Sequence, residues 1–326
     1  MKVKPTKILV FTGLIFTLLT APAASAQKPD KQLTIYATVS NKKGEAVSDV
    51  KAEQFRLFEE GKEKQITSLS NENEPLTVGI LLDVSSSMTR AWRKVDGKSV
   101  LRQCVADLIN FSNKDNEYFI VTFGEKLNVI QELTRDHDEL GKALNRAAEF
   151  RAQESTKLFD AVYSGLKKIS EGSYRKKVLI VVSDGDDSDS LYNFAELRRA
   201  INDSNTLIYF VGMFANDDYV SFFGLSGKLF SNELARISGG KAFAAALKNS
   251  DEKKLKAEDV FSLLTQELQK QYAITFDVSP AGEKNKWHDI ELKLSLTKDQ
   301  EKSLGKLSVR TRSGYFPFSD EALSER

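Results

Sequence analysis

The chain has 326 residues, a formal net charge of +1 and 41% hydrophobic residues, which is enough apolar content for ordinary folded cores. The near balance of charge gives no electrostatic case for binding nucleic acid or an anionic membrane. Cys104 is the only cysteine, which excludes an internal disulfide. We expect Cys104 to be a small buried hydrophobic residue on a helix, with a reactive or intermolecular thiol as the alternative.

Residues 1–26 are expected to be a bacterial export signal. Three lysines accompany a short apolar stretch from Ile8 to Leu19, and Ala24-Ser25-Ala26 forms a small-residue cleavage site before Gln27. The stretch is too short for a stable membrane span, and no later run is long enough for one. We therefore expect a periplasmic or extracellular mature protein with a net charge of −2, from 44 basic and 46 acidic residues.

Residues 27–74 and 271–326 both show β-strand patterns. A turn at Glu60-Gly61-Lys62 joins strands expected at 55–58 and 64–69, after an alternating segment at 33–39. The other group has strands expected at 272–278, 288–296 and 307–312. Each group alone would expose an apolar face and open edges. We therefore expect the two groups to pair into one small β-sandwich, with the middle of the chain inserted.

Residues 75–270 alternate between strand and helix patterns, which predicts an α/β domain with a doubly wound, mostly parallel sheet. Six strands are expected, at 76–82, 118–123, 127–132, 177–183, 206–211 and 241–244. Six helices are expected, at 95–111, 135–148, 157–171, 192–203, 230–238 and 257–270. The turn between the second and third strands is too short for a crossover, so the third is expected to be an antiparallel edge strand.

Three oxygen-bearing side chains follow the first of these strands. Asp83, Ser85 and Ser87 come directly after a buried apolar run, at the carboxyl end of a strand where open α/β sheets bind ligands. Carboxylate and hydroxyl oxygens suit Mg²⁺, Mn²⁺ or Ca²⁺ rather than zinc or copper. The pattern indicates a candidate cation site, with a plain serine-rich turn as the alternative.

Asp83-Val84-Ser85-Ser86-Ser87 resembles the first segment of the metal-ion-dependent adhesion site of von Willebrand factor A domains. Ser86 stands where many members have glycine, at a position that does not bind the metal. The resemblance implies that Thr156 and Asp184, in the second and third segments of such a site, complete the ligand set. A helix N-cap is the alternative role for Thr156.

The resemblance further implies that the strands ending at Asp83 and Asp184 are neighbours at the switch point of the sheet. It implies one divalent cation, with Mg²⁺ expected and Mn²⁺ or Ca²⁺ as alternatives. One coordination position would remain open for a Glu or Asp carboxylate of a protein partner. In the family, binding of such a ligand can shift the final helix, here expected at 257–270.

Three residues are expected at a partner-binding rim around the site: Trp92, Asp186 and Asp187. Trp92 follows the first loop and is either an exposed interface anchor or packed on its own loop. Asp186, Asp187 and Asp189 form an acidic run, which is a solvated loop, a second cation site or a means of attracting cations. The apolar Phe222-Phe223-Gly224 either contacts a partner or covers a helix.

The flanks carry a closer resemblance. Residues 47–61, the pair Gln271-Tyr272 and the segment Arg310–Tyr315 resemble the flanks of exported bacterial "VWFA-related" proteins, typical of Acidobacteria. This resemblance covers nearly the whole mature chain and implies its architecture more firmly than its role.

We expect an exported, metal-dependent module for protein binding or adhesion, with no catalytic residues. A structural envelope module, in which the metal only stabilises loops, is the first alternative. A hydrolase is the second. Neither His137 nor His288 is placed to activate Ser85 or Ser87, and no Gly-x-Ser-x-Gly, phosphate-binding or His-Glu-x-x-His motif is present.

Overall fold

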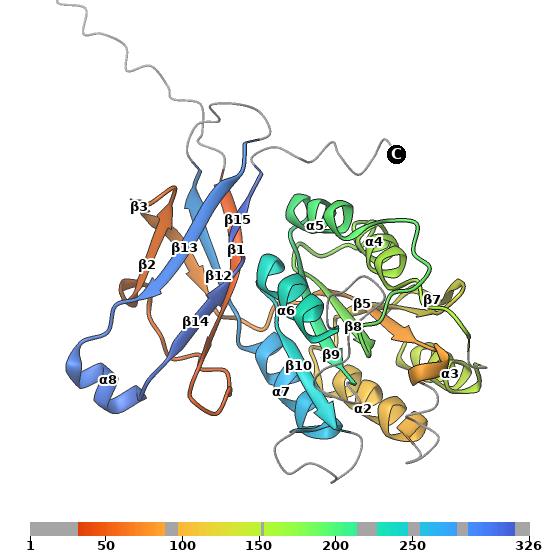
Figure 1. Cartoon of the computed structure of the whole chain (residues 1–326). Helices are drawn as coiled ribbons and strands as arrows, with labels where there is room; N and C mark the ends of the chain where they lie inside the picture. Colours follow the sequence, from red (N-terminus) through yellow and green to blue (C-terminus); the bar gives the residue numbers. More distant parts are fainter. Residues whose placement is uncertain are drawn as a thin grey trace, which may run out of the picture.

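The computed structural model describes residues 32–88, 97–150, 153–213, 227–246, 255–278 and 286–316. These residues form an α/β domain and, beside it, a β-sandwich built from both ends of the chain (Figure 1). The expected export signal lies outside them. Among the described helices, none is long and apolar enough to cross a membrane.

The α/β domain is built on a seven-stranded sheet with the order β11-β10-β9-β8-β5-β6-β7. Its strands are β5 (Thr77–Asp83), β6 (Glu117–Phe123), β7 (Leu127–Thr134), β8 (Lys177–Ser183), β9 (Thr206–Gly212), β10 (Ala242–Ala246) and β11 (Leu255–Lys256). All neighbouring strands are parallel except β6 and β7, which confirms the antiparallel edge strand. The two-residue β11 is the strand that the sequence did not predict.

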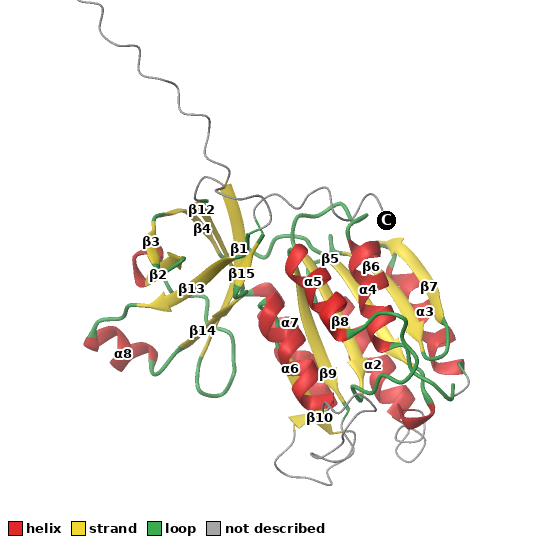
Figure 2. Cartoon of the chain, turned by 45° about the horizontal axis from the view of Figure 1, so that its top comes forward, coloured by secondary structure: helices red, strands yellow, loops and turns green. Residues whose placement is uncertain are grey.

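Helices cover both faces of this sheet (Figure 2). On one face lie α2 (Gly97–Phe111), α3 (His137–Glu149) and α7 (Ala257–Gln269), and on the other α4 (Leu158–Ile169), α5 (Phe194–Asp203) and α6 (Gly227–Ser238). Between Thr77 and Asp83, strand β5 is apolar because its residues alternate between the two cores: Ile80 and Leu82 enter one core and Leu81 the other. Cys104 is buried in the first core, as expected.

The β-sandwich consists of two four-stranded sheets, and each sheet contains strands from both ends of the chain. One sheet has the order β14-β1-β12-β4, formed by Ser308–Thr311, Gln32–Ser40, Tyr272–Asp277 and Ile66–Ser70. The other has the order β15-β13-β2-β3, formed by Gly314–Tyr315, His288–Leu294, Phe55–Glu59 and Lys62–Lys64. The expected pairing of the terminal strands is therefore present, and a third core lies between the sheets.

Besides the short strand β15 and a 3-10 helix at Ala52–Gln54, neither of which was predicted, the sandwich differs from the prediction in two places. The single strand expected at 64–69 is divided at Gln65, so that β3 pairs with β2 in one sheet and β4 with β12 in the other. The second difference is helix α8 (Lys298–Leu304), which begins at a capping box formed by Thr297 and Gln300. That pair is a helix-start signal present in the sequence.

A buried polar cluster joins α7 to the β-sandwich. Glu267 is 2% exposed, and its Oε1 accepts hydrogen bonds from the Thr38 hydroxyl at 3.1 Å and the Tyr209 hydroxyl at 2.6 Å. The same oxygen forms an ion pair with Arg310 of β14. Because Thr38 lies in β1 and Tyr209 in β9, one carboxylate connects helix α7, the central sheet and the sandwich.

Candidate metal centre

The topology brings the first and third predicted segments to the same edge of the sheet. Strands β5 and β8 are adjacent and parallel, with Leu82 opposite Val182. Asp83 is the last residue of β5, and Asp184 directly follows β8. The two carboxylates therefore stand at neighbouring carboxyl ends, at the switch point where the helices that follow β5 and β8 cover opposite faces of the sheet.

Hydrogen bonds hold the loop that follows β5, the first loop of the site, around the Asp83 carboxylate. Asp83 is completely buried, and it accepts hydrogen bonds from the Ser85 backbone N–H at 2.8 Å and from the Ser183 hydroxyl at 2.6 Å. The Ser85 and Ser87 hydroxyl oxygens are 3.0 Å apart. Ser183 was not predicted, although its place just before Asp184 at the end of a strand was visible in the sequence.

The electrostatics of the pair suit a cation. Burial, followed by the charge of the Asp184 carboxylate, raises the pKa of Asp83 from its ordinary value of 3.8 to about 7. Burial also raises the pKa of Asp184, against a hydrogen bond from the Ser87 side chain. No Lys or Arg in the described part of the chain forms an ion pair with either carboxylate. A divalent cation would supply the missing positive charge, so the donor set fits such an ion.

Thr156 lies in the second loop of the site, between α3 and α4. Its backbone is hydrogen-bonded to the third loop, which follows β8. Its N–H donates to the Ser188 hydroxyl at 3.0 Å, and its carbonyl accepts from the N–H groups of Ser188 at 2.9 Å and Asp189 at 3.1 Å. Thr156 is 3% exposed and is not the cap of α4. The N-cap is Lys157, which makes no side-chain cap hydrogen bond, so the alternative role as a cap is wrong.

Gln153 joins the second loop to the first and to the β6–β7 turn. Its carbonyl accepts the Ser86 N–H at 2.7 Å, and its own N–H donates to the Val84 carbonyl at 3.2 Å. Its side-chain Oε1 accepts the Lys126 N–H at 3.1 Å. A Cβ at Gly124 would lie 2.6 Å from that oxygen, so glycine permits the approach. Sequence reasoning missed Gln153, which carries no metal-ligand signal of its own.

The structure corrects one of the expected rim residues. Asp187 is 1% exposed, and its Oδ1 accepts the Phe159 N–H at 3.0 Å, so the carboxylate caps α4 from inside the fold. It is not a rim residue. Asp186 is partly buried, and its N–H donates to Asp184 Oδ1 at 3.2 Å. Trp92 and the Phe222-Phe223-Gly224 segment lie outside the described residues.

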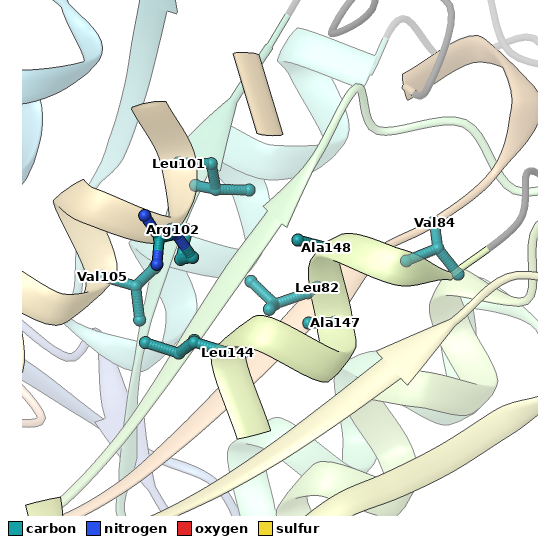
Figure 3. A pocket seen from close by; sticks show the side chains of 8 residues that line it. All are labelled: Leu82, Val84, Leu101, Arg102, Val105, Leu144, Ala147 and Ala148. Atoms are coloured by element: carbon teal, nitrogen blue, oxygen red, sulfur yellow. The ribbon is translucent and has the colours of Figure 1, made fainter. Parts of the chain in front are cut away.

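An apolar pocket lies beneath the first loop (Figure 3). Val84, between Asp83 and Ser85, contributes to its wall, together with Leu82 and residues of α2 and α3. Its free volume of about 20 Å³ has room for about one water molecule. This pocket is therefore too small for a cofactor, and its lining has no carboxylate.

The two histidines of the chain, which were considered as catalytic residues, lie away from these loops. His137 is the first residue of α3, and His288, in strand β13 of the sandwich, lies 3.0 Å from Glu59. Among the described residues, no three His, Cys, Asp or Glu side chains gather to hold a metal. The candidate centre therefore depends on two carboxylates together with the hydroxyls of Ser85, Ser87 and Thr156.

Three comparisons place the chain among known proteins. Solved structures similar to it include a von Willebrand factor type A protein from Catenulispora acidiphila, with 13% identity, a TM-score of 0.47, and coverage of 93% of this chain and 77% of that one. Another is the conserved hypothetical protein BatB from Bacteroides thetaiotaomicron, with 15% identity, a TM-score of 0.44, and coverage of 60% and 98%.

A third is proximal thread matrix protein 1 from the mussel byssus with a zinc-occupied MIDAS motif, with 13% identity, a TM-score of 0.48, and coverage of 66% and 50%. Among curated protein sequences, none matches this chain. The family profile described as von Willebrand factor type A domain matches residues 77–262, more than half of the chain. The chain therefore belongs to the von Willebrand factor type A domain family.

Proposed function

We propose that the protein is an exported, metal-dependent module for protein binding or adhesion. Asp83, Ser85, Ser87, Thr156 and Asp184 would hold one divalent cation, with Mg²⁺ as the expected ion. Membership of the family supports an interaction module in general. The observation that carries the metal site is the burial of Asp83 beside Asp184 without a compensating Lys or Arg among the described residues.

The charge balance supports a partner that supplies a carboxylate. Two protein carboxylates roughly neutralise one divalent ion, and the three hydroxyl ligands are neutral. When bound, the ion would offer an open coordination position to a Glu or Asp side chain of the partner. The chain's own part is to hold five oxygens at one edge of the sheet and to keep the two carboxylates out of bulk water.

The second candidate function is a structural module whose metal only holds the loops together. The hydrogen bonds of Gln153 and Thr156 already join the three loops through the backbone. A metal is therefore not needed to gather them, and this favours a binding role. We further propose that the protein is not an enzyme, because the two histidines belong to other parts of the fold.

Metal-dependent capture of a partner tests this function. The mature chain is immobilised and exposed to a cell-envelope extract with Mg²⁺ or with EDTA, then crosslinked. We expect a partner captured only with Mg²⁺, lost with Asp184→Asn and retained with Asp138→Asn, a change at an exposed acid of α3. Capture by the wild-type chain that persists in EDTA, or capture by Asp184→Asn that equals that of the wild-type chain with Mg²⁺, would contradict the proposal. Raised thermal stability with Mg²⁺ but no partner would support the structural module.

A further inference from the structure

We propose that Asp187 is a positioning residue of the metal centre, which holds Thr156 in place without binding the ion. The inference rests on the proposed metal site and names a residue that site needs. It starts from the short distance along the chain between Thr156 and the first residue of α4, Leu158. A ligand two residues before a helix is fixed only as well as that end of the helix.

The N-terminus of α4 has no cap from its own segment. Lys157 occupies the N-cap position without a side-chain cap hydrogen bond, which leaves the first N–H groups of the helix to other partners. Asp187 supplies one such partner, because its Oδ1 lies 3.0 Å from the Phe159 nitrogen. Ser190 supplies another, because its Oγ lies 3.1 Å from the Asp160 nitrogen. The third loop therefore caps the helix that follows the second.

The residues next to Asp187 bind Thr156 directly. Ser188 exchanges two hydrogen bonds with the Thr156 backbone, and the Asp189 N–H donates to the same carbonyl. Residues 187–189 thus hold the segment from Thr156 to Phe159 at both of its ends. We call these three residues and their hydrogen bonds the clasp. Because Asp184 lies in the same loop, the clasp sets the spacing between two of the proposed ligands.

The clasp offsets part of the cost of burying a carboxylate at position 187: Oδ1 accepts hydrogen bonds, while the buried Oδ2 has no partner among the described residues. Asp187 is 1% exposed, and burial raises its pKa, so the charged form is costly at this place unless donors offset it. The N–H groups of a helix N-terminus are such donors, and they also carry the positive end of the helix dipole. A solvated rim residue would need neither the burial nor the contact with α4.

The test compares metal affinity with stability in matched variants of the mature chain. Mn²⁺ is the probe, and its binding is followed by the relaxation of water protons. Asp187→Ala should weaken Mn²⁺ binding about tenfold, as loss of a residue supporting a metal ligand commonly does. Asp187→Asn keeps an oxygen acceptor for the helix and should remain near wild type.

The matched control is Asp136→Ala. The Asp136 side chain caps α3 through the N–H groups of Asp138 and Glu139, so the variant removes the same kind of cap. Helix α3 begins after strand β7, which is antiparallel to β6. The removed cap therefore lies at the end of the sheet opposite the candidate metal centre. We expect Asp136→Ala and Asp187→Ala to lower the melting temperature to similar extents, with only Asp187→Ala weakening Mn²⁺ binding.

Unchanged Mn²⁺ affinity in Asp187→Ala would overturn the inference, and so would equal weakening in both alanine variants. Absence of Mn²⁺ binding by the wild-type chain is a different result. It would end the proposed metal function itself, and the positioning role with it.

Discussion

Replacement of Glu267 by alanine is expected to destabilise the whole chain, because one buried carboxylate joins three elements. Its Oε1 accepts the Tyr209 and Thr38 hydroxyls at 2.6 and 3.1 Å and pairs with Arg310. Loss of the carboxylate would leave Tyr209, which is completely buried, without its acceptor. It would also leave the Arg310 charge without its counterion at the interface between the domains.

The size of the effect follows from the exposure of each partner. Removing one member of a fully buried ion pair costs about 3–5 kcal/mol, and an unsatisfied buried hydroxyl costs about 1–3 kcal/mol. The Arg310 side chain is 27% exposed, so water compensates it in part. Gln271 donates to both hydroxyls, so each keeps one hydrogen bond although its own O–H group loses the Glu267 acceptor. We therefore expect a loss of about 3 kcal/mol.

Urea unfolding, followed by circular dichroism with fixed metal and protein concentrations, measures this loss. Glu258→Ala is the control, because Glu258 is an exposed residue of the same type on the same helix. Glu258→Ala should lower the free energy of unfolding by at most about 1 kcal/mol, because it removes a favourable interaction with the helix dipole. A loss below about 1 kcal/mol for Glu267→Ala would refute the view that this cluster holds the two domains together.

Three further predictions concern single positions. Gly185→Ala should cost about 2 kcal/mol or more by thermal unfolding, because Gly185 has φ +83° and an added Cβ would lie 2.6 Å from the Gly227 Cα; an unchanged melting temperature would contradict this. Burial lowers the pKa of Lys176 from 10.5 to about 8, so the unfolded chain binds this proton more tightly. Wild-type stability should therefore rise between pH 8 and 10.5 relative to Lys176→Met, by at most about 1.4 kcal/mol per pH unit, and parallel pH curves would argue against it. Thr297→Ala should weaken α8 locally by about 1 kcal/mol, seen as faster amide exchange in that helix and not elsewhere, whereas equal protection in both chains would speak against the cap.

The architecture was predictable because its signals are local and periodic. Strands such as β5 and β8 are apolar runs that end at polar residues, and the short turn before Leu127 leaves room only for an antiparallel strand. The pairing of the terminal strands followed from the need to cover apolar faces. The division of the strand at Gln65 between two sheets has no such signal, because the same alternation suits either sheet.

The candidate ligands could be proposed from the sequence, but the residues that support them could not. Asp83, Ser85, Ser87 and Asp184 stand out by residue type and by their place at the ends of strands, whereas Thr156 lies before α4 and was proposed from the family resemblance. Their supports act through backbone groups or through caps, which depend on tertiary neighbours. Gln153 and Ser188 are ordinary loop residues in the sequence. Asp187 is buried, but in the sequence it does not differ from the exposed acidic residues beside it.

The position of Glu267 illustrates the same limit. In the sequence it is one more acidic residue on an amphipathic helix, where a solvated place would be expected. Its partners Thr38, Tyr209 and Arg310 come from three strands far apart along the chain. Only the packed structure shows that this carboxylate is buried.

The most direct test of the central claim is the stoichiometry of Mn²⁺ binding, measured by isothermal titration calorimetry on the mature chain. We predict one ion per wild-type chain and none for Asp184→Asn, whose fold is checked by circular dichroism. The Asp138→Asn variant, changed at an exposed acid of α3, should bind as the wild type does. Equal Mn²⁺ binding by Asp184→Asn and the wild-type chain, or no binding by either, would contradict the proposed metal centre.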